Sequence, residues 1–210
     1  MTLAARIGMS VLGVAVCGVS VGMFRTAALG VDPFQALMSG LASLVPMGFG
    51  TLYLTANAGL LLFAAVFDRR KIGPSTVINL TLLGYIAQYS QALFTALVPH
   101  GTLPSRLLLL AAAVAVMCLS SALYFNADLG VSPYDAVALV LAQGRKRFSF
   151  KACRVMTDLV CVALGAALCR LSGMGWRETG GVVGVGTIVT AFFMGPLISF
   201  FSGLLPGGRQ

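Results

Sequence analysis

The chain carries ALGVDPFQAL at residues 28–37 and, one hundred residues later, DLGVSPYDAV at residues 128–137, and the two stretches align without a gap. Glycine tolerates the left-handed backbone that ends many helices, and proline is favoured in the first turn of a helix. Each stretch therefore predicts an elbow, in which one helix ends at the glycine and the next begins at the proline. The elbow residues are Gly30, Pro33, Gly130 and Pro133.

A second match extends the similarity over most of the chain. Residues 73–79 (GPSTVIN) align with residues 184–190 (GVGTIVT), and Asn57 falls opposite Asp158 if one residue is inserted in the intervening loop. The sequence thus predicts one domain built from two halves of similar pattern. The domain covers residues 1–210, and the halves cover about 5–98 and 105–205.

The composition indicates a membrane protein. Of the 210 residues, 58% are hydrophobic and only 10% are charged, whereas soluble domains carry about 25% charged residues. The net charge is +8, but the chain lacks the polar surface of a nucleic-acid-binding protein. We therefore expect the excess Lys and Arg to flank membrane spans, with the lipid bilayer as partner and no nucleic acid.

Six stretches are long enough to cross a bilayer core of about 30 Å, which takes about 20 residues of helix. They lie at about 5–24, 50–67, 74–98, 106–125, 152–171 and 181–205. The apolar stretches 33–46 and 133–143 begin with proline and are too short to span, so they are predicted to be re-entrant or interfacial helices. The predicted fold is an all-α membrane protein with six transmembrane helices in two three-helix repeats. Because three is odd, the repeats are inverted relative to each other.

The basic residues orient these spans. Under the six-span count nine lie on one side, namely Arg6, Arg69, Arg70, Lys71, Arg145, Lys146, Arg147, Lys151 and Arg209. Four lie on the other side, namely Arg25, Arg106, Arg170 and Arg177. Cytoplasmic loops are rich in Lys and Arg, so both termini are expected in the cytoplasm of a bacterial cytoplasmic (inner) membrane. A cleaved secretory signal is the alternative for 5–24, but that stretch is longer than a usual signal core and has a counterpart in the second half.

The two elbows and the segment GVGTIVTAFFMGPLISFF at residues 184–201 resemble the YczE/YyaS/YitT family of bacterial integral membrane proteins. The resemblance covers roughly residues 6–203. It implies a cytoplasmic-membrane protein of five or six spans, and it supplies no catalytic or binding residues. Candidate site residues therefore come from the sequence pattern alone.

Four polar residues at the elbows are candidates for binding a substrate or an ion. A helix start presents unpaired N–H groups and a partial positive charge. Asp32 and Ser132 stand at the N-cap positions, where each could cap its own short helix or contact a ligand. Gln35 and Asp135 are the next equivalent pair. The carboxylate of Asp135 could bind a cation or relay a proton, or it could complement the helix dipole.

Asp158 and Arg154 place two charges in the predicted fifth span. Their i,i+4 spacing allows an ion pair, either as a functional site or as an interfacial salt bridge with Arg154 reaching the cytoplasm. Asn57 aligns with Asp158, so the two could face one interior. Asn79 in the third span is a further candidate, with helix–helix hydrogen bonding as its alternative. Two glycines, which would let backbone approach a ligand or a neighbouring helix, complete the set: Gly184 and Gly186.

Signals for enzymatic chemistry are missing from the sequence. The chain has no P-loop, HExxH or G-x-S-x-G motif, and its one histidine and five cysteines show no metal-ligand spacing. We therefore expect no enzymatic activity, no cofactor and no metal site.

The inverted repeat favours a small secondary transporter or permease for a small polar solute or ion, because such transporters bind substrates near the midplane between their halves. Two alternatives stay open. One is a substrate-binding membrane subunit of a larger transport complex, and the other is a membrane scaffold or regulator without transport. A chain of this size is small to enclose a wide path alone, which favours a homodimer.

We predict that a reporter fused after Gln210 lies in the cytoplasm, because nine of the thirteen loop and terminal basic residues gather on that side. A fluorescent-protein fusion should fluoresce, and an alkaline phosphatase fusion at the same point should be inactive. An active phosphatase fusion would overturn the orientation and the inverted repeat together.

Overall fold

The computed structural model describes residues 2–67, 72–98, 101–143 and 150–204. The secondary structure in these ranges is helical, in the order α1 (Leu3–Ala27), α2 (Pro33–Leu44), α3 (Phe49–Phe67), α4 (Pro74–Leu97), α5 (Leu103–Ala127), α6 (Pro133–Gln143), α7 (Phe150–Leu171), α8 (Trp176–Val182) and α9 (Val185–Leu204). The basic runs at 69–71 and 145–147 and Arg209, which orient the predicted spans, lie outside the described residues.

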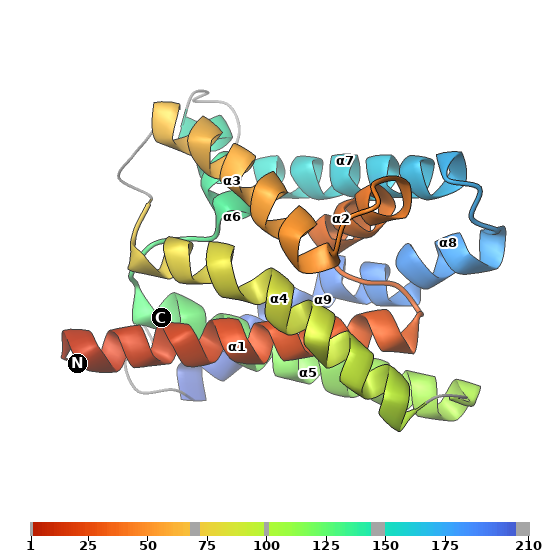
Figure 1. Cartoon of the computed structure of the whole chain (residues 1–210). Coiled ribbons are helices and arrows are strands. Elements are labelled where there is room, and N and C mark those ends of the chain that lie inside the picture. Colours follow the sequence, from red (N-terminus) through yellow and green to blue (C-terminus); the bar gives the residue numbers. More distant parts are fainter. Residues whose placement is uncertain (1, 68–71, 99–100, 144–149, 205–210) are drawn as a thin grey trace.

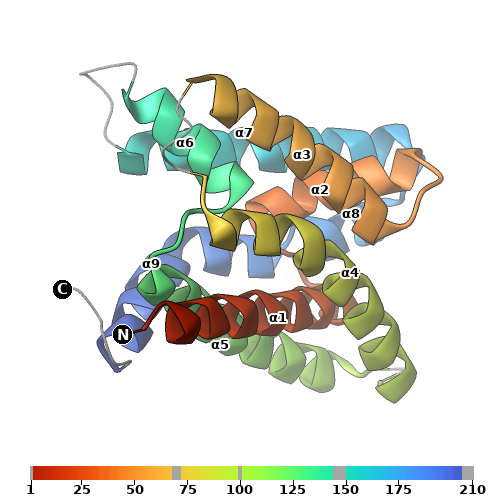
Figure 2. The same cartoon turned by 60° about the vertical axis from the view of Figure 1, so that its left-hand side comes forward.

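The helices lie in two tiers, which Figure 2 separates most clearly. One tier holds α1, α4, α5 and α9, and the other holds α2, α3, α6 and α7 (Figure 1). Within the first tier α1 packs against both α4 and α5, and α5 packs against α9. Within the second tier α2 packs on α7, and α6 packs on α3. Each short helix therefore packs against a long helix from the other half of the chain.

Within the described ranges, three helices are long and apolar enough to cross a membrane: α1, α3 and α5. The segment from Trp176 to Leu204 adds a fourth if it crosses as one span, with a bend of 57° near Pro196. The helices α4 and α7 have 24 and 22 residues but are not in this group. The described residues thus support a helical membrane protein, and the six spans stay a prediction.

The helix expected at about 181–205 begins only at Val185, because the chain breaks between α8 and α9. In a continuous helix the carbonyls of Gly181 and Val182 would accept from the N–H groups four residues on. Here they accept from the N–H groups of Gly30 and Val31, at 2.9 and 3.0 Å. The N–H of Gly186 also donates to the carbonyl of Leu29 in the first elbow, at 2.8 Å. The first elbow thus occupies the acceptors that would continue the helix.

The two elbows have closely similar backbone conformations. The residues that follow α1 and α5, Ala28 and Asp128, are left-handed with φ of +50° and +48°. Two residues later Gly30 and Gly130 have φ of +105° and +113°. A side chain is strained in this region, so glycine is the residue that suits these two positions. A new helix then begins at each elbow proline.

Each elbow is held by an arginine from the other half. The Nε of Arg6 donates to the carbonyl of Ala127 at 2.7 Å, and its Nη2 donates to the carbonyl of the next residue. The Nε of Arg106 donates to Ala27 at 2.7 Å, and its Nη2 donates to the next carbonyl at 2.5 Å. The last carbonyls of a helix lack helical partners and carry partial negative charge, so a guanidinium satisfies both needs. The charge pattern of the sequence indicates these two arginines only as charges that flank spans.

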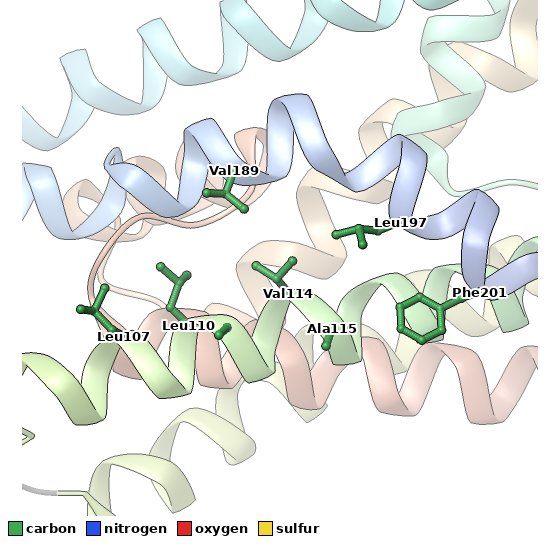
Figure 3. A pocket seen from close by; sticks show the side chains of 8 residues that line it. Leu107, Leu110, Val114, Ala115, Val189, Leu197 and Phe201 are labelled. Carbon is green, nitrogen blue, oxygen red and sulfur yellow. The ribbon is translucent and has the colours of Figure 1, made fainter.

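The tier of α1, α4, α5 and α9 is packed closely between α1 and α4 and loosely between α5 and α9. On α1, Gly18 lies so close to α4 that an added Cβ would meet Ile86 at 2.7 Å. The helix α5 has no interior glycine, and a cavity of about 460 Å³ lies between α5 and α9. Figure 3 shows that both helices line it with apolar side chains, Leu110 and Val114 facing Val189 among them. The side chains that line this cavity are apolar and offer no hydrogen-bonding group to a polar solute.

We predict that Gly130→Ala lowers the free energy of unfolding by about 1–3 kcal/mol, the usual cost of one strained backbone position. The new Cβ would also meet the backbone nitrogen of Gly73 at 2.7 Å. Gly8→Ala is the matched control, because its Cβ would meet nothing within 4 Å on α1. Thermal unfolding in detergent measures both. Equal melting temperatures for the two variants would contradict the elbow geometry.

Candidate functional site

Arg154 joins two carboxylates that come from different helices. Its Nη1 pairs with Oδ1 of Asp135 on α6, and its Nε lies 3.3 Å from Oδ1 of Asp158, four residues further along α7. The i,i+4 pair expected from the sequence is therefore present, and Asp135 adds a partner that the spacing alone did not indicate. We call these three side chains the ion-paired cluster. All three are partly buried.

Neighbouring hydroxyls complete the hydrogen bonding of this cluster. Ser132 accepts from the N–H of Asp135 at 3.1 Å, as an N-cap does, and donates to Oδ2 of the same residue at 2.7 Å. The hydroxyl of Tyr134 donates to Oδ1 of Asp158 at 2.7 Å. The guanidinium of Arg154 also lies 4.5 Å above the Tyr134 ring. Tyr134 is not among the candidates drawn from the sequence, although its place beside Asp135 in the elbow is a usable signal.

The corresponding polar residues of the first half are buried but incompletely bonded. Asn57 is 1% exposed, and its Nδ2 donates to the carbonyl of Tyr53 at 2.9 Å. Among the described residues its Oδ1 has no hydrogen-bond partner, and the same holds for Oε1 of Gln35 and Oδ1 of Asn79. Gln35 and Asn79 are 4% and 7% exposed. A buried acceptor without a donor costs about 1–3 kcal/mol, so these oxygens need an explanation.

The structure does not join Asn57 to Asp158 by a hydrogen bond between the described residues. Asp158 instead contacts Arg154 and Tyr134, while Asn57 bonds to its own helix. A shared wet interior for the two therefore stays a prediction. Of the eight polar candidates, the structure brings four together: Ser132, Asp135, Arg154 and Asp158.

Asp32 lies in the loop between α1 and α2 and caps α2 through its Oδ1, which accepts from the N–H of Gln35 at 3.2 Å. Burial raises the pKa of this carboxyl to about 6, and the hydrogen bond from Gln35 and the Arg154 guanidinium oppose that rise. The carboxylate of Asp158 adds to it. Asp32 therefore interacts electrostatically with the ion-paired cluster, although it belongs to the other elbow.

An apolar groove of about 820 Å³ runs between α2, α3, α6 and α7. At its inner end the rings of Phe34 and Tyr134 stack, with centroids 4.7 Å apart. Phe63 and Phe67 of α3 line it further out and are themselves exposed. Its volume is within the range of small-molecule sites, about 300–1,000 Å³. Tyr134, whose hydroxyl donates to Asp158, therefore also lines the groove.

The glycine segment serves backbone packing. The backbone of Gly184 lies against Gly30, because a Cβ added to Gly30 would lie 2.7 Å from the backbone nitrogen of Gly184. The N–H of Gly186 donates to the carbonyl of Leu29. The aligned segment meets the second elbow in a related way, since the hydroxyl of Thr76 donates to Val131 at 2.7 Å. Of the two interpretations of these glycines, close approach of another segment is the one observed. Among the described residues no group of three or more His, Cys, Asp or Glu could hold a metal ion.

Comparison with known proteins places the chain in a family without an assigned activity. The model of a family of unknown function (DUF6198) matches residues 4–203, so the chain belongs to that family. It is similar to an uncharacterized protein of Haemophilus influenzae, with 24% identity over 200 residues, which covers 95% of this chain and 84% of that protein. No solved structure matches. These findings do not name the YczE/YyaS/YitT family, and they do not conflict with that resemblance.

We predict that Asp32→Asn stabilises the protein increasingly as pH rises from 5 to 7.5. A carboxyl whose pKa is raised from about 4 to about 6 on folding favours the folded state at low pH, and this contribution is lost as pH passes through 6. Asparagine keeps the acceptor for the N–H of Gln35. The titratable groups that act on Asp32 are Arg154 and Asp158, and Asp32 in turn acts on Cys17, Tyr53 and Cys161.

The difference in melting temperature between variant and wild type tests this prediction, measured at each pH in detergent with N-methyl-D-glucamine chloride as the salt. Asp128→Asn is the control at the other elbow, because that carboxylate is 74% exposed; it pairs with Arg6 at 3.3 Å, and Arg6 keeps its hydrogen bond to the carbonyl of Ala127 in the variant. A difference that stays constant for Asp32→Asn across the pH range would contradict it.

Proposed function

We propose that this member of the DUF6198 family is a small secondary transporter or permease of the bacterial cytoplasmic membrane, with a small polar solute or ion as its substrate. The observation that carries the proposal is the ion-paired cluster at a broken helix. Charged side chains inside a membrane protein are costly, and in known cases they mark substrate or ion pathways. Non-helical backbone at membrane depth is tolerated where it is buried in protein or lines a cavity.

The elbows support an inverted repeat of two three-span halves. The left-handed residues that follow α1 and α5 match, and Arg6 and Arg106 cap the opposite helix ends in the same manner. The aligned segments that begin at Gly73 and Gly184 each lie against the elbow of the other half. Two halves joined at such reciprocal contacts could rock against each other, as alternating access requires.

In the ion-paired cluster, a substrate or coupling ion would replace Arg154 as the partner of a carboxylate. Arg154 pairs with both Asp135 and Asp158, which leaves one net negative charge on the ion-paired cluster, so a cationic group or a proton that reaches either carboxylate would release Arg154 from it. This change would affect the groove through Tyr134, because the hydroxyl of Tyr134 bonds to Asp158 and its ring lines the groove. Asp135 and Asp158 are thus our candidates for substrate or coupling-ion contact.

Two other functions each have one observation in their favour. The groove of about 820 Å³ would suit a substrate-binding subunit of a larger complex, which would hold a ligand tightly without transporting it. The internal pairing of Asp135, Arg154 and Asp158 would suit a scaffold, whose polar interior needs no ligand. A homodimer would be compatible with any of the three.

Flux into proteoliposomes tests the proposal. Purified full-length protein should accelerate the uptake of at least one solute from a panel of Na⁺, K⁺, guanidinium, glycine, glutamate and glycerol, measured against empty liposomes. We expect Asp158→Asn to abolish this uptake while its melting temperature falls only modestly, because Arg154 keeps Asp135 as partner. Asp128→Asn, at an exposed carboxylate, should transport normally. Uptake unchanged in Asp158→Asn would remove the cluster from the pathway.

A further inference from the structure

We propose that the first elbow carries a binding site for a small monovalent cation, formed by the side-chain oxygens of Asp32, Gln35 and Asn57. The site is distinct from the ion-paired cluster at the second elbow. It does not require transport, because binding is measurable in solubilised protein that moves nothing.

The second half has a resident cation at the equivalent positions. There the aligned residues are Ser132, Asp135 and Asp158, and the guanidinium of Arg154 sits between the two carboxylates. The residue that aligns with Arg154 in the first half is Tyr53, four residues before Asn57. The first half therefore has an acidic and amide-rich set of side chains without the cation that its counterpart contains.

The unsatisfied atoms of the first elbow are acceptors. Oε1 of Gln35 and Oδ1 of Asn57 are buried without a partner among the described residues. The orientation of the Asn57 amide is fixed, because its Nδ2 donates to the carbonyl of Tyr53 at 2.9 Å. An acceptor oxygen is satisfied by a hydrogen-bond donor or by a cation. Carboxylate and amide oxygens are the ligands that hard cations prefer.

Contacts of Asp32, Phe34 and Tyr53 bring the first turn of α2, which carries Gln35, close to the middle of α3, which carries Asn57. The N–H of Gln35 donates to Asp32 at 3.2 Å, so both belong to the first turn of α2. The neighbouring Phe34 meets the ring of Tyr53 edge-on, with centroids 5.8 Å apart. Tyr53 in turn interacts with both Asp32 and Asn57. The first turn of α2 and the middle of α3 therefore face each other across Tyr53.

The basic side chains of the described residues do not occupy this site. The described residues form no salt bridge to Asp32; Arg154 acts on it only at longer range. Arg25 has an unpaired buried nitrogen, but its guanidinium stacks on the ring of Phe49 at 3.7 Å and is not among the groups that act on Asp32. One carboxylate with two neutral amides is balanced by a single positive charge, which favours a monovalent cation over a divalent one.

Melting of the solubilised full-length chain tests the site. N-methyl-D-glucamine chloride serves as background and is replaced stepwise by NaCl, KCl or, up to 10 mM, guanidinium chloride at constant ionic strength. A ligand that binds only the folded state raises its stability in proportion to the logarithm of ligand concentration above Kd. We expect at least one cation to raise the melting temperature in this way at pH 7.5. Stabilisation by Na⁺ or K⁺ identifies an alkali-ion site, and stabilisation by guanidinium identifies a site for organic cations.

Variants separate the site from a general salt effect. Asp32→Asn and Asn57→Leu should each raise the half-saturating concentration at least tenfold, whereas Asp128→Asn, at the exposed carboxylate, should leave it unchanged. Direct binding of the radiolabelled cation gives a readout independent of stability, should either variant fold poorly. Equal melting in all salts at constant ionic strength would overturn the proposal, as would full stabilisation in both site variants. Loss of uptake with cation binding intact would count against the transporter and not against this site.

Discussion

The constraint on which this structure depends is the need to satisfy backbone groups at two broken helices. A helix that stops within a membrane protein leaves carbonyl and N–H groups for which lipid offers no partner. Here the other half of the chain supplies those partners, through Arg6 and Arg106 at the carbonyl ends and through the break before α9 at the first elbow. The halves are therefore complementary, and the interior polar residues are positioned by that contact.

The two elbows use one backbone design with different side chains, and the difference is electrostatic. At the second elbow Arg154, Ser132 and Tyr134 bond to the carboxylates. At the first elbow Gln35 and Asn57 keep buried oxygens without donors. Two such atoms cost about 1–3 kcal/mol each, and leucine at either position would avoid that cost. An unliganded scaffold gains nothing from them, whereas a binding protein recovers the cost when its ligand enters.

Local chemistry made part of this structure predictable. The helix starts at Pro33 and Pro133 and the caps at Asp32 and Ser132 depend on neighbouring residues alone, and the Arg154–Asp158 pair depends on helical spacing. The contact of Arg154 with Asp135 needs α6 to lie against α7, which no local pattern encodes. The break before α9 was unpredictable for the same reason, since its cause is the first elbow, some 150 residues earlier. The unpaired oxygens became visible only once burial was known.

Asp32 links the two sites physically, because it is close enough to Arg154 and Asp158 for its charge to interact with both. When Asp32 is ionised it attracts the guanidinium that also holds Asp135 and Asp158. A cation bound at the proposed site would cancel that attraction and leave Arg154 to the two carboxylates of the second elbow. Occupancy of that site would therefore change the strength of the ion pairs at the second elbow. By linkage, loosening the ion-paired cluster would change the affinity of the first elbow by the same factor.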